Sequence, residues 1–139
     1  MQIRAATESD LGKVEKLFSL PELAEANGEY CSAEILADYI DEKFFLVAED
    51  AGGIIGALFG ERLKGAGMLL WVFAIEEGMR GKGVGTALLT NFENNMALEN
   101  RTWIMLYAPA QSPKTIRFYE NRGYQKGKPQ IEFLKCFNQ

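Results

Sequence analysis

The sequence contains no histidine, only two cysteines and no long apolar run. Without histidine, a Ser-His-Asp triad, a Cys-His dyad and a His-ligated zinc site are all excluded. Two cysteines cannot form a four-thiolate metal site, and no acidic cluster suggests Mg or Mn. Reduced thiols favour a cytoplasmic protein, and the longest apolar run, residues 68–75, is far shorter than the roughly 20 residues of a membrane helix. These absences favour chemistry that needs neither a metal nor a nucleophilic side chain.

Acidic and basic residues are unevenly distributed along the chain. Residues 1–61 contain thirteen acidic and four basic residues, a net charge of −9, whereas residues 62–139 contain six and eleven, a net charge of +5. A basic half suits a polyanionic cofactor and an acidic half suits a cationic substrate, although two solvated faces explain the pattern equally well. An overall charge of −4 without a basic stripe argues against nucleic-acid binding.

Length and hydrophobic spacing predict one domain, residues 1–139, built from alternating strands and helices. The predicted strands are residues 1–6, 44–49, 54–62, 68–75, 102–108 and 130–137. The predicted helices are residues 7–18, 33–40, 84–100 and 113–121, with Gly123 at the expected C-cap position of the last. Because residues 68–75 are continuously apolar, we expect them to form a central strand that is covered on both faces. A turn at residues 50–53 is expected to join the strands at 44–49 and 54–62 into an antiparallel hairpin. Together these elements indicate a mixed sheet with helices on both faces.

A glycine-rich loop, RGKGVG at residues 80–85, joins the strand at 68–75 to the longest predicted helix. Alternating glycines allow the backbone to approach a ligand closely, and N–H groups at a helix N-terminus attract anions. Arg80 and Lys82 add positive charge, so the loop is predicted to bind phosphate. For an isolated pattern of this kind, a turn that serves only helix packing is the simpler alternative.

Two common phosphate-binding patterns do not fit this loop. A P-loop requires Ser or Thr after Gly-Lys, but Gly81-Lys82 is followed by another glycine, and Glu76 stands where the first glycine is needed. The dinucleotide fingerprint GxGxxG fails because neither Gly81 nor Gly83 is followed by the third glycine at the required spacing. NTP hydrolysis and dinucleotide binding are therefore disfavoured.

The loop instead resembles the pyrophosphate motif of the GNAT-type (CoA-dependent) N-acetyltransferase superfamily, Q/R-x-x-G-x-G/A, which here reads Arg80-x-x-Gly83-x-Gly85. Ile75 matches the apolar residue that ends the family's fourth strand, and residues 118–124, FYENRGY, resemble its FYxxxGF segment. The resemblance implies a GNAT-type acyl-CoA acyltransferase fold of the α/β (α+β) class. Such a fold has a mixed, mostly antiparallel six- to seven-stranded sheet with helices on both faces.

The resemblance also implies that acetyl-CoA is the co-substrate and that the fourth and fifth strands splay apart to admit its pantetheine arm. A backbone N–H of the fourth strand would stabilise the oxyanion. Tyr119 matches the family's general acid, which protonates the departing thiolate, with packing beneath the cofactor as its alternative role. The expected cofactor-binding residues are Phe73, Ala74, Ile75, Arg80, Gly81, Lys82, Gly83, Val84, Gly85, Thr86, Ser112 and Tyr119.

Several positions depart from the family pattern. Ser112 and Thr115 stand where the family often has Asn and Ala. The glutamate that is the general base in some members has no counterpart near residues 68–70. Glu61 and Glu76 are then the nearest candidate bases, and an exposed ion pair is the alternative role of each. The segment that resembles the family's variable substrate wall, expected to select a cationic amine, contains Glu22, Glu25, Glu29 and Tyr30.

Three functions fit these observations. The leading hypothesis is transfer of an acetyl group from acetyl-CoA to an amine of a small molecule or protein, by direct attack in a ternary complex and without a metal. The alternative is a catalytically weak acyl-CoA-binding or sensing domain. The third is a subunit whose acidic N-terminal half binds a basic protein. Near the end of the chain, Phe133, Leu134 and Phe137 either mediate a homodimer or complete the core of their own domain.

Overall fold

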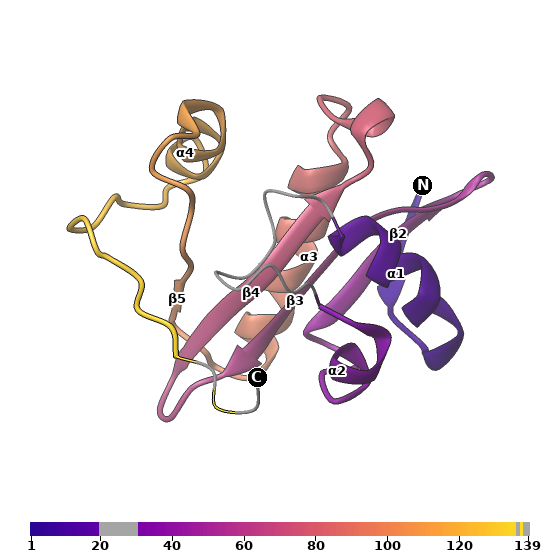
Figure 1. Ribbon diagram of the computed structural model, residues 1–139, viewed down its shortest axis with the longest axis horizontal. Coiled ribbons are helices and arrows are strands. Elements are labelled where there is room, and N and C mark those ends of the chain that lie inside the picture. The colour runs from indigo at the N-terminus through magenta and orange to yellow at the C-terminus, as the bar shows by residue number, and fades with distance from the viewer. Residues whose placement is uncertain (20–30, 136, 138–139) are drawn as a thin grey trace. The chain divides into compact units, whose positions relative to one another are not determined.

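The computed structural model describes residues 1–19, 31–135 and 137. The chain divides into two compact units, Met1–Leu106 and Tyr107–Gln139. The second unit contains the helix α4 (Pro113–Glu120), and Figure 1 shows all the elements. In chain order, the first unit contains β1 (Gln2–Ala5), η1 (Glu8–Asp10), α1 (Leu11–Phe18), α2 (Ala33–Ala37), β2 (Phe45–Asp50), β3 (Gly53–Arg62), β4 (Gly67–Ile75), η3 (Glu77–Met79), α3 (Val84–Leu98) and β5 (Trp103–Met105).

The five strands form one sheet in the order β1-β2-β3-β4-β5. Every neighbouring pair is antiparallel except β4 and β5, which are parallel, so the mixed and mostly antiparallel character is confirmed. The predicted turn between β2 and β3 is also present. There the Asp50 carboxylate accepts a hydrogen bond from the Gly52 N–H, and Gly53 has φ of 112°.

The expectation of six to seven strands is wrong for the residues that the structure describes, because residues 130–135 form no strand. Apolar residues alternate in this segment as they do in a strand, but alternation makes a strand only where a sheet edge supplies hydrogen-bond partners. Phe133 is 90% exposed, and Leu134 and Phe137 are exposed as well. These three exposed side chains therefore do not complete a core, and the homodimer stays a prediction.

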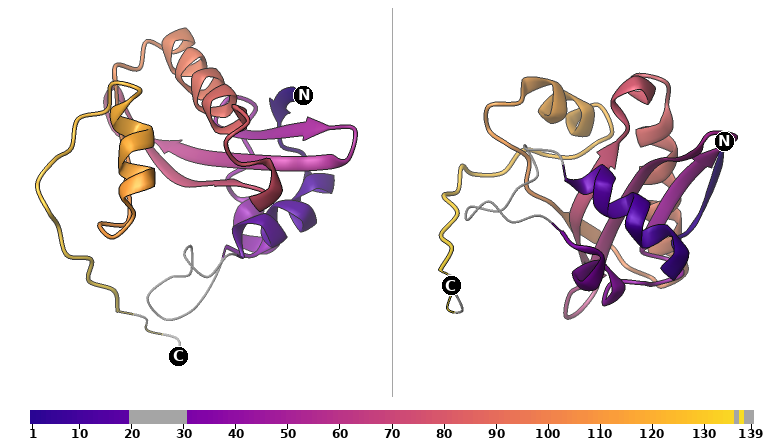
Figure 2. Two further views of the ribbon diagram at one scale, coloured as in Figure 1. Left: turned by 90° about the horizontal axis from the view of Figure 1, so that it is seen from above. Right: turned by 45° about the vertical axis from the view of Figure 1, so that its right-hand side comes forward.

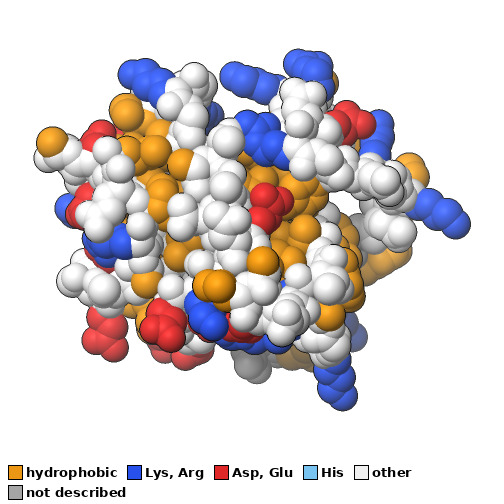
Figure 3. All heavy atoms as spheres, turned by 180° about the vertical axis from the view of Figure 1, so that it is seen from behind, with side chains coloured by type: hydrophobic (Ala, Val, Ile, Leu, Met, Phe, Trp, Pro, Cys, Tyr) orange, Lys and Arg blue, Asp and Glu red, His pale blue; other side chains and the backbone are white. Residues whose placement is uncertain are grey.

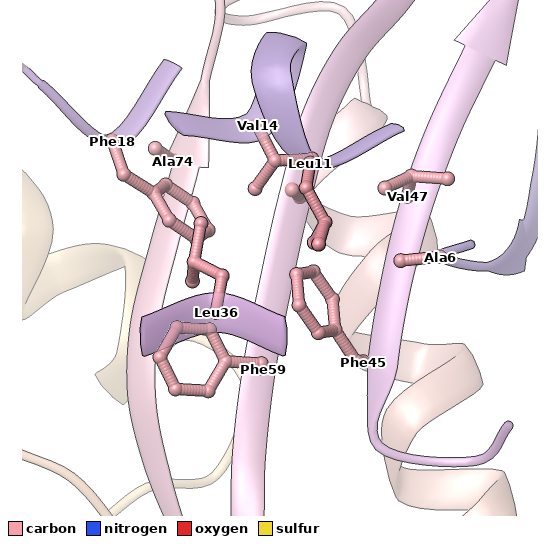
Figure 4. Close-up of a cluster of buried hydrophobic side chains, with 10 residues drawn as sticks. Ala6, Leu11, Val14, Phe18, Leu36, Phe45, Val47, Phe59 and Ala74 are labelled. Atoms are coloured by element: carbon pink, nitrogen blue, oxygen red, sulfur yellow. The ribbon is translucent and has the colours of Figure 1, made fainter. Parts of the chain in front are cut away.

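Helices cover both faces of the sheet, as predicted (Figure 2). On one face, α1 and α2 bury an apolar cluster against β2, β3 and β4, in which Phe18 and Leu36 contact the sheet around Phe59 (Figure 4). On the other face, α3 packs the apolar stripe that contains Leu88 and Phe92. Gly60 permits this contact, because an added Cβ would lie 2.7 Å from the Phe92 ring.

Three elements are shorter than the sequence predicted. The helix expected at 33–40 is the single α2 turn Ala33–Ala37, the strand expected at 102–108 is β5 (Trp103–Met105), and α3 ends at Leu98. Asn100 follows α3 with a left-handed φ of 58°, which an asparagine tolerates and which ends the helix. No helix in the described part of the chain is long and apolar enough to cross a membrane.

A charged cluster, the hairpin clasp (Asp41, Lys43, Arg62, Glu99 and Arg101), ties the β3–β4 turn to the end of α3. Arg62 donates to both oxygens of Glu99 at 2.8 and 2.6 Å, and Lys43 and Arg101 each approach Glu99 at 3.2 Å. Arg62 also donates to Asp41 at 2.6 Å. The three cations hold the pKa of Glu99 well below its usual range.

Candidate functional site

The β4–α3 loop has the backbone shape that the phosphate prediction required. β4 ends at Ile75, as predicted, and the chain then passes through η3 before Gly81 and Gly83, whose φ values are 78° and 85°. Residues with a Cβ rarely adopt such angles. An added Cβ at either glycine would meet no atom within 4 Å. Backbone conformation, and not crowding, therefore requires glycine here, and space remains beside the loop.

The loop leads directly into the first turn of α3. Gly83 is the N-cap and offers no side chain, and the Ala87 N–H donates to the Gly83 carbonyl at 3.0 Å. By helix geometry, the N–H groups of the three preceding residues, Val84, Gly85 and Thr86, point out of the helix start. This end of a helix is electropositive and favours an anion.

Two exposed cations lie beside this helix start. Arg80 donates from Nε to the Ile75 carbonyl at 3.1 Å, which holds it against the end of β4, and Lys82 lies between the two left-handed glycines. Basic side chains project along the upper edge of the face in Figure 3, the edge at which the β4–α3 loop lies in Figure 1. The loop therefore combines backbone donors and positive charge in one place.

β4 and β5 separate after a short ladder. β5 pairs only with Gly67–Leu69, the first three residues of β4. On its other side β4 has a bulge, because Phe59 lies opposite Val72 while Gly60 lies opposite Leu70, so that Trp71 has no counterpart. A bulge bends its strand and increases its twist. The β4–β5 ladder therefore ends at Leu69, and the splaying of these two strands, which the family resemblance implied, stays a prediction.

In the second unit, the FYENRGY segment ends α4. The Tyr124 N–H donates to the Tyr119 carbonyl and the Gly123 N–H to the Glu120 carbonyl, both at 3.1 Å, and Gly123 has φ of 87°. These two bonds form a Schellman motif, which confirms the predicted C-cap glycine. The Tyr119 ring lies 5.4 Å from the Tyr124 ring. Burial raises the pKa of Tyr119 to about 12, so its hydroxyl keeps its proton at neutral pH.

Comparison with known proteins decides the family. The model of the acetyltransferase (GNAT) domain matches residues 41–126, more than half of the chain, and the match runs through both compact units. This chain belongs to the GNAT acetyltransferase family.

Relatives of this GNAT protein differ widely in sequence. An uncharacterized N-acetyltransferase of Methanocaldococcus jannaschii is 34% identical over 85 residues, which are 60% of this chain and 54% of that protein. The chain thus spans about half the length of this curated relative.

Solved structures show that the GNAT fold extends over most of the chain. Ard1 from Thermoplasma volcanium aligns with a TM-score of 0.79 and 24% identity over 91% of this chain and 84% of that one. An aminoglycoside acetyltransferase from an uncultured soil metagenomic sample, in complex with sisomicin, aligns with a TM-score of 0.75 and 18% identity. The alignment covers 99% of this chain and 96% of that one. The ribosomal-protein-S18-alanine N-acetyltransferase from Escherichia coli aligns with a TM-score of 0.74 and 17% identity, over 91% of this chain and 79% of that one.

At two positions this GNAT protein departs from the family pattern, and there the structure supplies a local contact. Ser112 is the N-cap of α4, and its hydroxyl donates to the Thr115 hydroxyl at 2.8 Å. The two residues that replace Asn and Ala therefore bond to each other. The Ser112 oxygen keeps acceptor capacity, but its proton is engaged.

The two candidate bases of this GNAT protein lie at opposite ends of the β3–β4 pair. Glu61 lies opposite Leu69, whereas Glu76 follows the last residue of β4 and donates its N–H to the Ile55 carbonyl at 2.9 Å. At about 3.3 Å per residue, roughly 20 Å separates them, so they do not act together. Glu22, Glu25, Glu29 and Tyr30, the predicted substrate wall, lie outside the described residues.

Sequence reasoning missed two tryptophans, Trp71 in β4 and Trp103 in β5. Trp71 lies in the run that was expected to be buried on both faces, yet its side chain is 47% exposed, and Trp103 is 48% exposed. Pairing with β5 at only three positions explains the difference, because most of this side of β4 lacks a neighbouring strand. No group of three or more potential metal ligands lies together in the described part of the chain.

Proposed function

We propose that this GNAT protein transfers an acetyl group from acetyl-CoA to an amine of a small molecule or protein, by direct attack in a ternary complex. The observation that supports this most strongly is the β4–α3 loop, where Gly81 and Gly83 adopt left-handed angles at the start of α3. The proposal concerns the residues of this chain, since the match to the curated relative covers 54% of that protein.

The pyrophosphate of acetyl-CoA is proposed to bind at the start of α3, where backbone N–H groups and the Lys82 and Arg80 side chains offer positive charge. The pantetheine arm would then run along β4 beside Phe73, Ala74 and Ile75, in the region beyond the β4–β5 ladder. Ser112 is proposed as a further contact through its hydroxyl oxygen.

The reaction starts when the amine lone pair attacks the thioester carbonyl carbon and forms a C–N bond. The carbonyl oxygen becomes an oxyanion, which a β4 backbone N–H would stabilise. The C–S bond then breaks, leaving CoA thiolate and an amide nitrogen that has lost one proton. Since a thiol has a pKa of about 8.5, a tyrosine of pKa about 12 is the weaker acid. Tyr119 is therefore proposed to donate mainly a hydrogen bond to the departing sulfur, which solvent protonates.

Of the two candidate bases, we propose Glu61 as the group that receives the amine proton. Glu76 lies next to the proposed pyrophosphate site, where the phosphates would repel its carboxylate and disfavour an acceptor approaching there. Glu61 lies toward the other end of β4, away from the phosphates.

Tyr119→Phe tests this function. Turnover is expected to fall about a hundredfold, the low end of the range for loss of one hydrogen-bond donor that stabilises developing charge, while acetyl-CoA affinity measured by calorimetry stays the same. Tyr107→Phe, which removes a 71% exposed hydroxyl from the same unit, is the control and should leave both unchanged. Weaker acetyl-CoA binding in Tyr119→Phe would support the packing role. Acetyl-CoA binding without turnover on any amine would favour the sensing domain over the enzyme.

A further inference from the structure

Three side chains form a row across the sheet on the face that α1 and α2 partly cover. Glu61 in β3 lies opposite Leu69 in β4, and Leu69 lies opposite Met105 in β5. Directly paired residues project from the same face. Phe59 belongs to the apolar cluster beneath α1 and α2. Because Glu61 is two residues further along the same strand, it projects from the same face of the sheet as Phe59. Figure 1 shows α1 and α2 beside β2 and β3.

One of the two tryptophans, Trp103, lies on the same face, at the end of the row. Gly67 pairs with Trp103, and an added Cβ at Gly67 would lie 2.3 Å from the Trp103 ring. The indole therefore lies across Gly67. Trp71 is the extra residue of the β4 bulge, between Leu70 opposite Gly60 and Val72 opposite Phe59, so strand alternation assigns it to neither face. The row and the Trp103 indole together form what we call the tryptophan face: Glu61, Leu69, Trp103 and Met105.

The carboxylate in this face has no ion-pair partner among the described residues. Glu61 is half-buried, and within the described residues it makes neither an ion pair nor a hydrogen bond. Burial raises the pKa of Tyr39, and the charge of Glu61 raises it further, so the carboxylate lies close enough to act on that phenol. Tyr39 is itself packed against Phe59, with ring centroids 4.6 Å apart. A partly desolvated carboxylate among aromatic rings lacks the compensation that such groups usually have.

Aromatic faces and a carboxylate together suit a cation with an apolar body. An ammonium ion is attracted electrostatically to the carboxylate and to the Trp103 indole ring, and Trp gives the strongest such attraction among aromatic residues. Hydrocarbon attached to the ammonium would cover the exposed parts of Trp103 and Met105. A polyhydroxylated or highly charged amine would cover the same surface without burying hydrocarbon.

We propose that the tryptophan face binds the acceptor, and that the acceptor is an amine on an aromatic or other apolar body, held as its ammonium form by Glu61. This inference rests on the proposed acetyltransferase function and narrows its substrate class. It also gives Glu61 a sequence of roles. The carboxylate first pairs with the ammonium, takes one proton from it and passes that proton to solvent, leaving the neutral amine that attacks the thioester. It then receives the second proton, which the nitrogen loses as the amide forms, while solvent protonates the CoA thiolate.

Tryptophan fluorescence tests the proposal directly, because the chain contains only two tryptophans and one of them, Trp103, belongs to this face. Phenethylamine added to the wild-type protein in the presence of CoA is expected to change the emission saturably. Phenethyl alcohol, which lacks the charge, and ethanolamine, which lacks the apolar body, should each bind at least about tenfold more weakly. Binding of ethanolamine as tight as that of phenethylamine would overturn the proposal.

Glu61→Gln keeps the side-chain shape, removes the charge and should weaken phenethylamine binding about tenfold. Glu42→Gln is the matched control, since it removes the same charge from an exposed position outside this face and should leave binding unchanged. Circular dichroism and the melting temperature establish that both variants fold. Folded Glu61→Gln that binds phenethylamine as the wild type does would refute the role of the carboxylate.

The binding test and the activity test can fail separately. If phenethylamine binds in a Glu61-dependent way but no amine is acetylated, the tryptophan face stands and the acetyltransferase function falls. If hydrophilic amines are acetylated and Glu61→Gln leaves their KM unchanged, the function stands and the tryptophan face is refuted. Trp103→Leu should lower phenethylamine affinity while leaving acetyl-CoA affinity unchanged, which a general loss of structure would not do.

Discussion

The two ends of β4 contrast in how they use charged residues. At its start, the hairpin clasp joins Arg62 to Glu99 and Asp41, and Arg101 donates to three carbonyls of the β3–β4 turn. At its end, Arg80 and Lys82 are exposed beside two left-handed glycines and the start of a helix. At the first end the cations bind carboxylates and carbonyls of the clasp. At the second end Lys82 and Arg80 are exposed beside backbone donors, and Arg80 also donates to the Ile75 carbonyl.

This difference separates structural charge from ligand-binding charge within one strand. Cations that satisfy carboxylates and carbonyl groups of the fold stabilise it and have little left to offer a ligand. Cations beside a helix N-terminus and a glycine-rich backbone can bind an anion without disturbing the fold. Substitutions at the two ends should therefore affect different measurements: cofactor affinity at the loop and thermal stability at the clasp.

Gly83→Val is expected to have the largest effect on the loop. A β-branched residue at φ of 85° is strained, and its side chain would enter the space beside the α3 N-terminus. Acetyl-CoA affinity should fall by at least about tenfold, equivalent to about 1.4 kcal/mol, with calorimetry as the measurement. Gly78→Ala is the control, because Gly78 has ordinary φ and open space around it. Equal affinities of Gly83→Val and wild type would exclude this loop as the binding site.

Arg80→Ala should have a smaller effect of the same kind. Its guanidinium is exposed and held by the Ile75 carbonyl, so we expect a several-fold loss of acetyl-CoA affinity with little change in turnover at saturating cofactor. Steady-state kinetics separate the two, as KM for acetyl-CoA should rise while kcat holds. A collapse of kcat with unchanged affinity would place Arg80 in the chemical step and contradict the account.

Glu99→Gln should affect only the hairpin clasp at the start of β4. Removing the charge leaves Arg62, Lys43 and Arg101 without their shared carboxylate, and the melting temperature should fall by a few degrees. Because the folded-state pKa of Glu99 is depressed, its contribution is present above the ordinary glutamate pKa of about 4.3 and is lost as the pH falls below it. The difference in melting temperature from wild type should therefore shrink in acid. A loss of acetyl-CoA affinity in this variant would mean that the two ends are not independent.

The sequence alone predicted much of what the structure shows at the loop end of β4. Glycine spacing, two cations and position between an apolar run and a helical stripe predicted an anion site, and the left-handed angles of Gly81 and Gly83 agree. These features are local, so a short window of sequence contains them. The C-cap role of Gly123 was predicted for the same reason.

Features that depend on strand pairing could not be predicted from the sequence. In the clasp, Arg62 joins Asp41 to Glu99, which is 58 positions further along the chain. No pattern in the sequence indicates this contact. The exposure of Trp71 follows from a bulge and from the short β4–β5 ladder, which are set by partners on other strands. The predicted strand at 130–137 failed for the related reason that apolar alternation does not reveal whether an edge is available to pair with.

Calorimetric titration of the wild-type protein with acetyl-CoA and with acetylpantetheine, which lacks the pyrophosphate, tests the central claim most directly. Both ligands offer the same thioester and the same arm to β4, so their difference reports binding of the pyrophosphate and its nucleotide, and the effect of Gly83→Val on that difference reports the β4–α3 loop. The account predicts that acetyl-CoA binds at least about a hundredfold more tightly, about 2.7 kcal/mol, and that Gly83→Val removes most of this advantage. Equal affinity of the two ligands would contradict it.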